Sequence, residues 1–533
     1  YEDSSSTGIN STPNESAASS GAAYIFVRTG TTWSQQAYLK PKAVGTSQAG
    51  DQFGISVAIS GNTVVVGANR EDSSSTGVNS VPNDTGGSNF DSGAAYVFVR
   101  SGTTWSQQAY LKPASVPAGT TQAGDTFGDS VAISGDTVIV GAGRESSSSI
   151  GVNSTPNENA ASAGAAYIFT RSGTTWRQQA YLKPAAVGSS QTSDAFGSRV
   201  AISGDTVVVG ALGEDRSSYG VSSSPNVGAL DSGAAYVFVR SGAVWSQHAY
   251  LKPAAVGTTQ AGDTFGSSVG ISGDTVIVGA MGEDSSTTGI DSTPNESSLE
   301  SGAAYVFVRG GPTWIQQAYL KPGTVGTTQS DDLFGISVAI SGDTAVVGAI
   351  GEDSSTTGID SFPNESAAAS GAAYVFVRYG TYWSFPTYLK PAVVGNSQSG
   401  DSFGWSVAVS GDTVIVGALY EGSGSTGVNS TPNEGASGSG TAYIFRGLGP
   451  VLRSFSRSGA PVPDLADVRF STPGSASVNA QGDVMFDQAL LGLGTFGGLN
   501  RGIFSNLRDG VTVDAAFFNG TPLAGLDGFV LGS

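Results

Sequence analysis

One unit recurs along most of this chain, and its repetition limits the possible folds more than any local feature does. The unit opens with an Asp-x-Phe-Gly motif, which is found at Asp51, Asp125, Asp194, Asp263, Asp332 and Asp401. Successive openings are 74 residues apart once and 69 residues apart four times. A fixed period of this kind indicates a repeat architecture, in which a unit buries its apolar faces only against its neighbours.

Each unit has the pattern of four short strands. In one unit, Phe265, Val269 and Ile271 fall on alternate positions, which is typical of a strand. A Ser-Gly-Asp-Thr turn then predicts a tight hairpin, and the β-branched run after it predicts a strand covered on both faces. Residues 303–308 repeat that pattern, and residues 314–321 predict a half-exposed outer strand that ends at a proline.

Strands that are apolar on both faces are stable here only when the units pack around a common axis, and helix signals are absent. The sequence therefore predicts an all-β fold, a seven-bladed β-propeller of four-stranded antiparallel blades, within residues 1–449. The number seven comes from the third-strand motif Gly-x-Ala-Tyr, which begins at Gly21, Gly93, Gly164, Gly233, Gly302, Gly371 and Gly440.

The Asp-x-Phe-Gly opening, in contrast, occurs only six times. Because Tyr1-Glu2-Asp3 aligns with Tyr420-Glu421-Gly422, we expect the first blade to lack its first two strands. Three sources could supply them: residues upstream of Tyr1, the C-terminal segment, or another molecule.

The pattern changes after residue 449. Residues 450–533 predict a small β segment, because residues 470–489 read as a strand, a Gly-Asp hairpin and a second strand. Two interpretations stay open. Residues 467–490 could donate strands to the first blade, in the same molecule or a neighbouring one. Alternatively, the segment is the start of a second repeat domain.

The repeated motifs also resemble a known family. Phe-Gly at the start of the unit and Val-Gly-Ala at the end of its second strand resemble the FG-GAP repeats of integrin-α-type propellers. The runs Gly-Glu-Asp-Ser-Ser, Ser-Gly-Ala-Ala-Tyr-Val-Phe and Trp-Ser-Gln-Gln-Ala-Tyr-Leu-Lys resemble arrays in bacterial secreted and surface proteins. The resemblance covers about residues 1–449. It implies a β-propeller at an extracellular or cell-surface location, an adhesive role, and bound calcium.

The loop between the second and third strands carries the residues that suggest metal binding. Ca²⁺ takes six to eight oxygen ligands from carboxylates, carbonyls and hydroxyls. The candidate ligands are Glu71, Asp72, Asn79, Asp84 and Asp91 in one unit, Glu283, Asp284, Asp291 and Glu296 in another, and Glu352, Asp353, Asp360 and Glu365 in a third. The compact Asp-x-Asp-x-Asp-Gly spacing is missing, so a solvated loop held by Asx turns and a Pro-Asn turn is the alternative.

Other recurring side chains favour structural roles. We expect the Asp of Asp-x-Phe-Gly to accept backbone N–H groups and the Phe to fill the core. A tryptophan once per unit could hold a glycan, but packing between blades is the simpler interpretation. The lysine of Tyr-Leu-Lys-Pro is expected to lay its stem on the outer strand. His248, the single histidine, replaces a recurring glutamine and is expected to be a neutral substitution.

Charge and composition exclude several classes of function. The net charge of −19 disfavours nucleic acid and anionic membrane as partners. The absence of cysteine removes thiol chemistry, and no apolar run is long enough to span a membrane. Together with what the resemblance implies, we expect a non-enzymatic extracellular or cell-surface structural or adhesion protein. It would bind protein or glycan ligands through its loops, or assemble with copies of itself into filaments. The alternatives are a glycan-binding, lectin-like propeller and a polysaccharide-degrading enzyme.

Overall fold

The computed structural model describes most of the repeat region and five strands beyond it. The described ranges are 2–45, 48–83, 91–114, 122–186, 191–223, 228–254, 260–323, 329–395 and 397–448, followed by 461–462, 465–478, 484–492, 502–504 and 516–517. The chain divides into two compact units. The first comprises Tyr1–Phe376 and Phe385–Leu448, and the second comprises Val377–Ser384 and Gly449–Ser533.

The repeats form separate antiparallel sheets whose strands follow chain order. The first hairpin is β1 (Ala23–Thr29) and β2 (Thr32–Leu39). The next sheets contain β3 (Ser56–Ser60), β4 (Thr63–Ala68), β5 (Ala94–Ser101) and β6 (Thr104–Leu111), then β7 (Ser130–Ser134), β8 (Thr137–Ala142), β9 (Ala165–Ser172) and β10 (Thr175–Leu182), then β11 (Phe196–Ser203), β12 (Thr206–Ala211), β13 (Ala234–Ser241) and β14 (Val244–Leu251).

Three further sheets complete the set. They contain β15 (Phe265–Ser272), β16 (Thr275–Ala280), β17 (Ala303–Gly310) and β18 (Thr313–Leu320), then β19 (Ser337–Ser341), β20 (Thr344–Ala349), β21 (Ala372–Tyr379), β22 (Tyr382–Trp383) and β23 (Thr387–Leu389), and finally β24 (Phe403–Ser410), β25 (Thr413–Ala418) and β26 (Thr441–Arg446). The prediction of four-stranded antiparallel blades is confirmed, and the last of these sheets has three strands.

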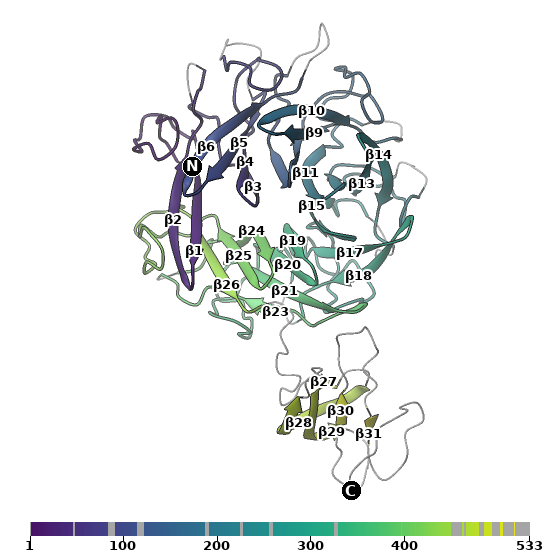
Figure 1. Ribbon diagram of the computed structural model, residues 1–533. Helices are drawn as coiled ribbons and strands as arrows, with labels where there is room; N and C mark the ends of the chain where they lie inside the picture. Colours follow the sequence, from purple (N-terminus) through teal and green to yellow (C-terminus); the bar gives the residue numbers. More distant parts are fainter. Residues whose placement is uncertain are drawn as a thin grey trace. The chain divides into compact units, whose positions relative to one another are not determined.

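The sheets are arranged radially, as Figure 1 shows. Their first strands contact one another in the order β3, β7, β11, β15, β19 and β24. The β1–β2 hairpin packs on the β3–β6 sheet, because Ala23, Ile25 and Leu39 share a core cluster with Phe53 and Tyr96. The β-propeller prediction is confirmed.

The predicted number of blades is wrong, because the residues that the structure describes form six blades and not seven. The count of seven used the third-strand motif, which the β1–β2 hairpin also carries. A blade needs the inner pair of strands that Asp-x-Phe-Gly opens, and the chain has six such openings. Counting the openings gives the observed number.

Neighbouring blades meet through glycine. A side-chain carbon added to Gly67, Gly141, Gly210, Gly279 or Gly348, each in the second strand of a blade, would collide with the carbonyl oxygen of the Phe-Gly glycine in the next blade. A serine hydroxyl strengthens three of these contacts. Ser56 Oγ donates to Gly128 O, Ser268 Oγ to Gly335 O and Ser337 Oγ to Gly404 O, all at 2.7 Å. The blades therefore touch backbone to backbone.

The second unit contains a five-stranded antiparallel sheet in chain order. Its strands are β27 (Pro461–Val462), β28 (Leu465–Val478), β29 (Val484–Gly492), β30 (Gly502–Phe504) and β31 (Ala516–Phe517). Within that sheet β28 pairs with β29, which agrees with the predicted strand–hairpin–strand pattern. The donation of residues 467–490 to the first blade stays a prediction.

Candidate functional site

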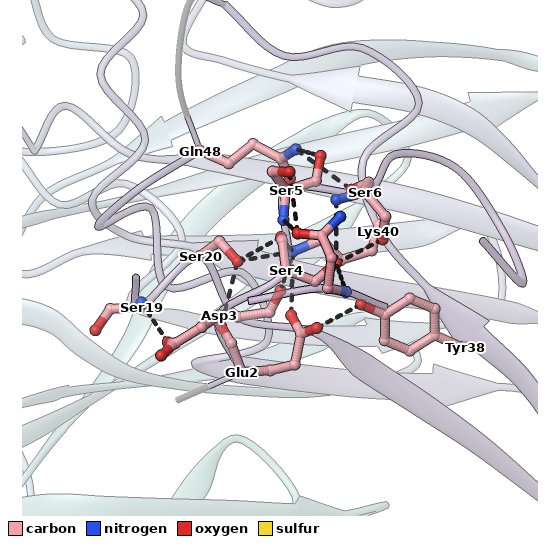
Figure 2. Close-up of polar contacts among 12 residues, drawn as sticks. Glu2, Asp3, Ser4, Ser5, Ser6, Ser19, Ser20, Tyr38, Lys40 and Gln48 are labelled. Atoms are coloured by element: carbon pink, nitrogen blue, oxygen red, sulfur yellow. Dashed lines mark hydrogen bonds and ion pairs between the residues drawn. The ribbon is translucent and has the colours of Figure 1, made fainter. Parts of the chain in front are cut away.

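A buried lysine organises the loop that we expected to bind calcium. In the β1–β2 hairpin, Lys40 is fully buried, and its ammonium group contacts four oxygen atoms (Figure 2). These are Glu2 Oε2 at 3.2 Å, Ser4 O at 2.6 Å, Ser20 Oγ at 2.9 Å and Gly21 O at 2.7 Å. A tyrosine hydroxyl two residues before the lysine donates to the other oxygen of Glu2 at 2.7 Å. We call this arrangement the lysine cluster.

The lysine–glutamate pair of this cluster recurs in each described sheet of the repeat region that has an outer strand. The lysine–glutamate pairs are Lys40–Glu2, Lys112–Glu71, Lys183–Glu145, Lys252–Glu214, Lys321–Glu283 and Lys390–Glu352, with Nζ–Oε2 distances of 3.2 to 3.5 Å. Each lysine is fully buried. We expected the lysine to lay its stem on the outer strand, and the structure buries its ammonium group as well, because the glutamate and the loop oxygen atoms replace the water that a buried ammonium loses.

The candidate calcium ligands of the β3–β6 sheet serve the loop itself. Glu71 accepts hydrogen bonds from Tyr110 and Lys112. Asp72 Oδ1 accepts the backbone N–H of Asp91 at 2.9 Å. Asn79 Oδ1 accepts the backbone N–H of Tyr110 at 3.1 Å, and Asp91 lies 4.0 Å from Arg70. Asp84 lies outside the described residues.

The other two sets repeat this use of the carboxylates. Glu283 and Glu352 belong to lysine clusters. Asp284 Oδ1 and Asp353 Oδ1 each accept a backbone N–H at 2.8 Å, and Asp291 Oδ1 and Asp360 Oδ1 accept the N–H groups of Tyr319 and Tyr388. Glu296 and Glu365 lie close enough to Asp263 and Asp332 to raise the pKa values of those carboxyl groups.

In this arrangement, the side-chain oxygen atoms of the loop make their contacts with groups of the same sheet. Within the described ranges, no three histidine, cysteine or acidic side chains converge as a metal centre would require. The lysine ammonium is the cation that the loop oxygen atoms surround. The candidate ligands of the described loops make contacts within the loop itself, and calcium binding stays a prediction.

The loop is also held by the asparagine of its Pro-Asn turn. Asn295 Oδ1 accepts the backbone N–H groups of Ser286 and Ser297, both at 3.0 Å. Asn364 Oδ1 accepts those of Ser355 and Ser366 in the same way. These contacts match the alternative in which Asx turns shape the loop.

The aspartate of Asp-x-Phe-Gly is buried beside the lysine cluster. Burial, followed by the charges of Glu283 and Glu296, raises the pKa of Asp263 to about 8. Similar surroundings raise the pKa values of Asp125 and Asp332 to about 8 as well. No hydrogen bond of the described residues reaches the carboxylate of Asp263, so the expected role as a backbone acceptor is not found there. Each of these blades holds a buried carboxyl group that favours its neutral form.

One blade differs, and sequence reasoning missed it. In the β11–β14 sheet, Arg216 is 2% exposed, and its Nε lies 2.6 Å from Glu214 Oε1. Its guanidinium also donates to the hydroxyl of Tyr236 at 3.1 Å. The β15–β18 sheet has Ser285 at this position, and the hydroxyl of Tyr305 there has no hydrogen-bond partner among the described residues. A basic residue inside an otherwise acidic loop motif was the available signal.

The recurring tryptophans connect neighbouring blades. Trp105, Trp176, Trp245 and Trp314 are 2–4% exposed. Their indole N–H groups donate to Gln36, Gln108, Gln179 and His248 of the preceding sheet, at distances of 2.8 to 3.1 Å. Packing between blades is therefore confirmed for these four. His248 is an acceptor in place of glutamine, which explains why the substitution is tolerated.

The phenylalanine of each opening fills the centre of its blade. Phe265 is fully buried and contacts the rings of Tyr305 and Phe307 on β17, with centroid distances of 5.4 and 6.0 Å. The β1–β2 hairpin has no such partner in the described chain. Tyr24 and Phe26 on β1 correspond to Tyr305 and Phe307, and they are 48% and 44% exposed. Among the described residues, the inner edge of β1 is consequently an apolar strand without a paired neighbour.

Two other surfaces of the described residues are exposed as well. On β3, Val57 and Ile59 are 60% and 62% exposed, whereas Val131 and Ile133 at the same places on β7 are buried. On the β24–β26 sheet, Ile415 and Ile444 are 40% and 38% exposed. Their equivalents on β16 and β17, Ile277 and Val306, are fully buried. We call β1 together with these two surfaces the open edge.

Comparison with known protein families agrees with the fold. The family model described as FG-GAP repeat matches residues 33–98, 105–169, 176–238, 245–307, 314–376 and 394–445. The first five matches each start in the outer strand of one sheet and end in the third strand of the next. No curated protein matches the chain.

Proposed function

The chain belongs to the FG-GAP repeat family, and from this premise we propose a non-enzymatic binding and structural role in which the open edge takes up β-strands from a partner. The observation that carries the proposal is the exposure of Tyr24 and Phe26, whose equivalents in the next sheet, Tyr96 and Phe98, are 1% and 0% exposed. Unpaired strand edges with apolar side chains are templates for strand addition.

Two features support this role over catalysis. The blades repeat the same polar contacts, so within the described residues no single blade concentrates titratable groups in a site of its own. The buried lysines and glutamates are paired with one another and are not available to a substrate. Within the part of the chain that the structure describes, no helix has the length and apolarity needed to cross a bilayer. We propose an extracellular or cell-surface location, as the resemblance to surface repeat arrays suggests.

Self-assembly is the form of strand uptake that we propose first. An open edge that receives strands from another copy makes a heterologous contact, and such contacts propagate into filaments when they do not close. The residue 467–490 segment is a donor to test, because β28 and β29 already pair as two antiparallel strands.

Light scattering of the full chain tests the proposal. We expect oligomers whose mass rises with protein concentration. The variant Tyr24→Lys/Phe26→Lys should stay monomeric, because two charges on β1 oppose strand addition without disturbing buried residues. A deletion of residues 467–490 identifies the donor. A full chain that stays monomeric at every concentration, with the amides of Ala23–Thr29 already protected from hydrogen exchange, would contradict the proposal.

Calcium binding is a separate proposal that the loop composition supports. If Ca²⁺ binds, it must compete for oxygen atoms that now contact backbone N–H groups and lysine. Isothermal titration with CaCl₂ on chelator-treated protein measures this directly. We expect an affinity no tighter than that of weak extracellular modules, about 10⁻⁴ to 10⁻³ M.

Glycan binding is a second candidate function, and one observation favours it. Trp405 and Tyr420 are 43% and 55% exposed and pack edge to face, with centroids 6.2 Å apart. Exposed aromatic rings are typical of sugar-binding surfaces. A glycan array on the native chain and on Trp405→Ala distinguishes this role from strand uptake, because the variant should lose only sugar binding.

A further inference from the structure

One blade carries its own cation at a place where three other blades gather carboxyl groups. In the β11–β14 sheet, this place is occupied by the guanidinium of Arg216. We infer that the same place is a binding site for a small monovalent cation in the β7–β10, β15–β18 and β19–β23 sheets. The inference concerns buried positions behind the loops, and it is independent of strand uptake at the open edge.

The guanidinium of Arg216 lies against side chains that the blades repeat. Its Nε lies 2.6 Å from Glu214 Oε1, and one Nη donates to the hydroxyl of Tyr236 at 3.1 Å. Its central carbon lies 5.4 Å from the centre of the Tyr250 ring, which is within the range of a cation–π contact. The equivalent side chains of the β15–β18 sheet are Glu283, Tyr305 and Tyr319. The recurring side chains at this place are therefore compatible with a positive charge.

In the β15–β18 sheet, the equivalent tyrosine hydroxyl has no hydrogen-bond partner among the described residues. It belongs to Tyr305, which is fully buried. Ser285 takes the place of Arg216 there, and its own hydroxyl contacts that of Thr287 at 2.8 Å. A buried polar atom without a partner is costly, and the lone pairs of a phenolic oxygen can accept a cation. This hydroxyl therefore points to a ligand that the described part of the loop does not supply.

Three carboxyl groups lie near this hydroxyl. Burial raises the pKa of Tyr305 most. Nearby charges raise that pKa further, those of Glu283, Asp263 and Glu296 among them. Glu283 has Lys321 as its cation, whereas Asp263 is 4% exposed and has neither a hydrogen bond nor an ion pair within the described residues. A cation beside Tyr305 would stabilise the acidic groups, because unpaired buried charge is costly.

The acidic residue that follows the Pro-Asn turn is missing only from the loop that carries the arginine. Six loops have an acidic residue directly after this turn: Glu15, Asp84, Glu158, Glu296, Glu365 and Glu434. The seventh loop has Val227 at that position, and it is the loop of Arg216. The chain therefore omits the acid where it supplies a positive charge itself. It keeps the acid where, on this inference, the charge comes from solution.

The charge of the ligand follows from the same comparison. Arg216 supplies one positive charge, and a monovalent cation would supply the same. A divalent cation attracts carboxylates about twice as strongly, and its centres gather several of them. Within the described ranges, no three histidine, cysteine or acidic side chains come together in that way. K⁺ or Na⁺ therefore fits the arrangement better than a divalent cation does.

Two further sheets repeat the arrangement. Burial, followed by nearby charges, raises the pKa values of Tyr167 and Tyr374, which are both buried. The nearby acids are Asp125, Glu145 and Glu158 for Tyr167, and Asp332, Glu352 and Glu365 for Tyr374. Ser147 and Ser354 take the place of Arg216. The molecule therefore contains three equivalent sites and, in the Arg216 loop, an internal control.

Hydrogen exchange of the native chain tests the inference, because each loop reports on its own site. The chlorides of K⁺, Na⁺ and tetramethylammonium are compared at equal ionic strength, so that surface charges are screened equally. The pH is set above the pKa of Asp263, which burial raises to about 8. Relative to tetramethylammonium, K⁺ or Na⁺ should slow exchange in residues 145–167, 283–305 and 352–374 by about fivefold or more. Residues 214–236 should change by less than about twofold, because Arg216 occupies their site.

A pair of matched variants moves the control from one blade to another. Ser285→Arg/Glu296→Val gives the β15–β18 loop the two residues of the Arg216 loop. In this variant, residues 283–305 should lose their response to K⁺ and Na⁺, whereas residues 145–167 and 352–374 should keep it. Arg216→Ser/Val227→Glu is the reverse exchange, and it should make residues 214–236 respond. If a variant does not fold, the comparison of the four loops in the native chain still decides.

Three results would overturn the inference. The first is an equal response of all four loops, which would be a general effect of salt. The second is no response of any loop to K⁺ or Na⁺. The third is a response to Ca²⁺ alone, which would mean that the ligand is divalent. None of these results depends on the oligomeric state of the chain, so strand uptake and the cation site succeed or fail separately.

Discussion

The β1–β2 hairpin and the β15–β18 sheet carry nearly the same outer half and differ in the inner half. The lysine cluster is intact in both: Lys40 and Lys321 each contact a glutamate, a serine carbonyl, a serine hydroxyl and a glycine carbonyl. Phe26, in contrast, is 44% exposed, and its equivalent Phe307 is fully buried. The lysine cluster therefore forms even in a two-stranded sheet. The third-strand phenylalanine, in contrast, is buried only where the inner strands of the blade are present.

The largest difference between the two regions is expected at the third-strand phenylalanine. Phe307→Ala should lower the free energy of unfolding by about 4 kcal/mol, because it leaves a cavity between β15 and β17. Phe26→Ala should cost under about 1 kcal/mol, because half of that ring is already in water. Urea unfolding of both variants checks this. Equal losses would mean that β1 is covered in solution.

The lysine cluster should behave more similarly in the two regions. Lys321→Met should cost about 3 kcal/mol, since it leaves the buried carboxylate of Glu283 without its cation. Lys40→Met should cost less, because the side chain of Glu2 is 20% exposed, whereas that of Glu283 is 3% exposed. The same urea measurement compares them. A larger loss at Lys40 would contradict the idea that solvent partly replaces its cation.

The seam glycines give the third test. Gly279→Ala should destabilise the chain by about 2 kcal/mol, because its carbon collides with the backbone of the next blade. Gly417→Ala faces no next blade in the described structure and should change stability by less than about 0.5 kcal/mol. Thermal unfolding of the pair is sufficient. A strongly destabilised Gly417→Ala protein would show that a hairpin is already bound at the open edge.

The buried aspartates predict a pH dependence that is weaker beside the open edge. The pKa of Asp263 is raised to about 8 and that of Asp401 to about 6. The unfolded chain ionises these groups near pH 4, so the folded state loses stability as pH rises from there to the folded pKa. Asp263→Asn should therefore gain stability relative to the native chain progressively up to pH 8, and Asp401→Asn only up to pH 6.

Urea unfolding between pH 4 and pH 8 measures both gains. A stabilisation by Asp263→Asn that does not change with pH would contradict this prediction. A stabilisation by Asp401→Asn that keeps increasing up to pH 8 would contradict it as well.

The smallest effect is expected at His248. His248→Gln restores the acceptor that Trp105, Trp176 and Trp245 already use, so stability should change by no more than about 0.5 kcal/mol. His248→Ala leaves the indole N–H of Trp314 without its acceptor and should cost about 1 kcal/mol. If the two variants are equally stable, the Trp314 contact contributes nothing measurable.

The sequence predicted the strands, which follow from the periodicity of apolar residues, and the burial of the large aromatic side chains. Alternation of apolar residues identified the strands, and the recurring Phe265 and Trp314 positions were placed correctly in the core and between blades. The burial of Lys321 was missed because an isolated lysine is exposed far more often than not, and its partner Glu283 lies in a different part of the repeat. The blade count failed at β1, since a third-strand motif does not reveal whether its inner neighbours are present.

The loop chemistry was the least predictable part. Glu283, Asp284 and Asp291 offer oxygen atoms in a pattern that suits a cation. Composition alone cannot show that Lys321 and backbone N–H groups already use those atoms. Arg216 shows the same limit, because its role follows from a contact with Tyr236 that no local motif announces.

The backbone contacts at these glycines affect how the number of repeats in such a chain can change. Because Gly67, Gly141, Gly210, Gly279 and Gly348 each meet main-chain atoms of the next repeat, the junction is the same whichever two repeats adjoin. A gene duplication or deletion of one whole 69-residue segment therefore creates no new incompatibility at the join. It alters only how far the series extends around the axis, and a series that stops short of a full circle exposes the junction surface at both of its ends.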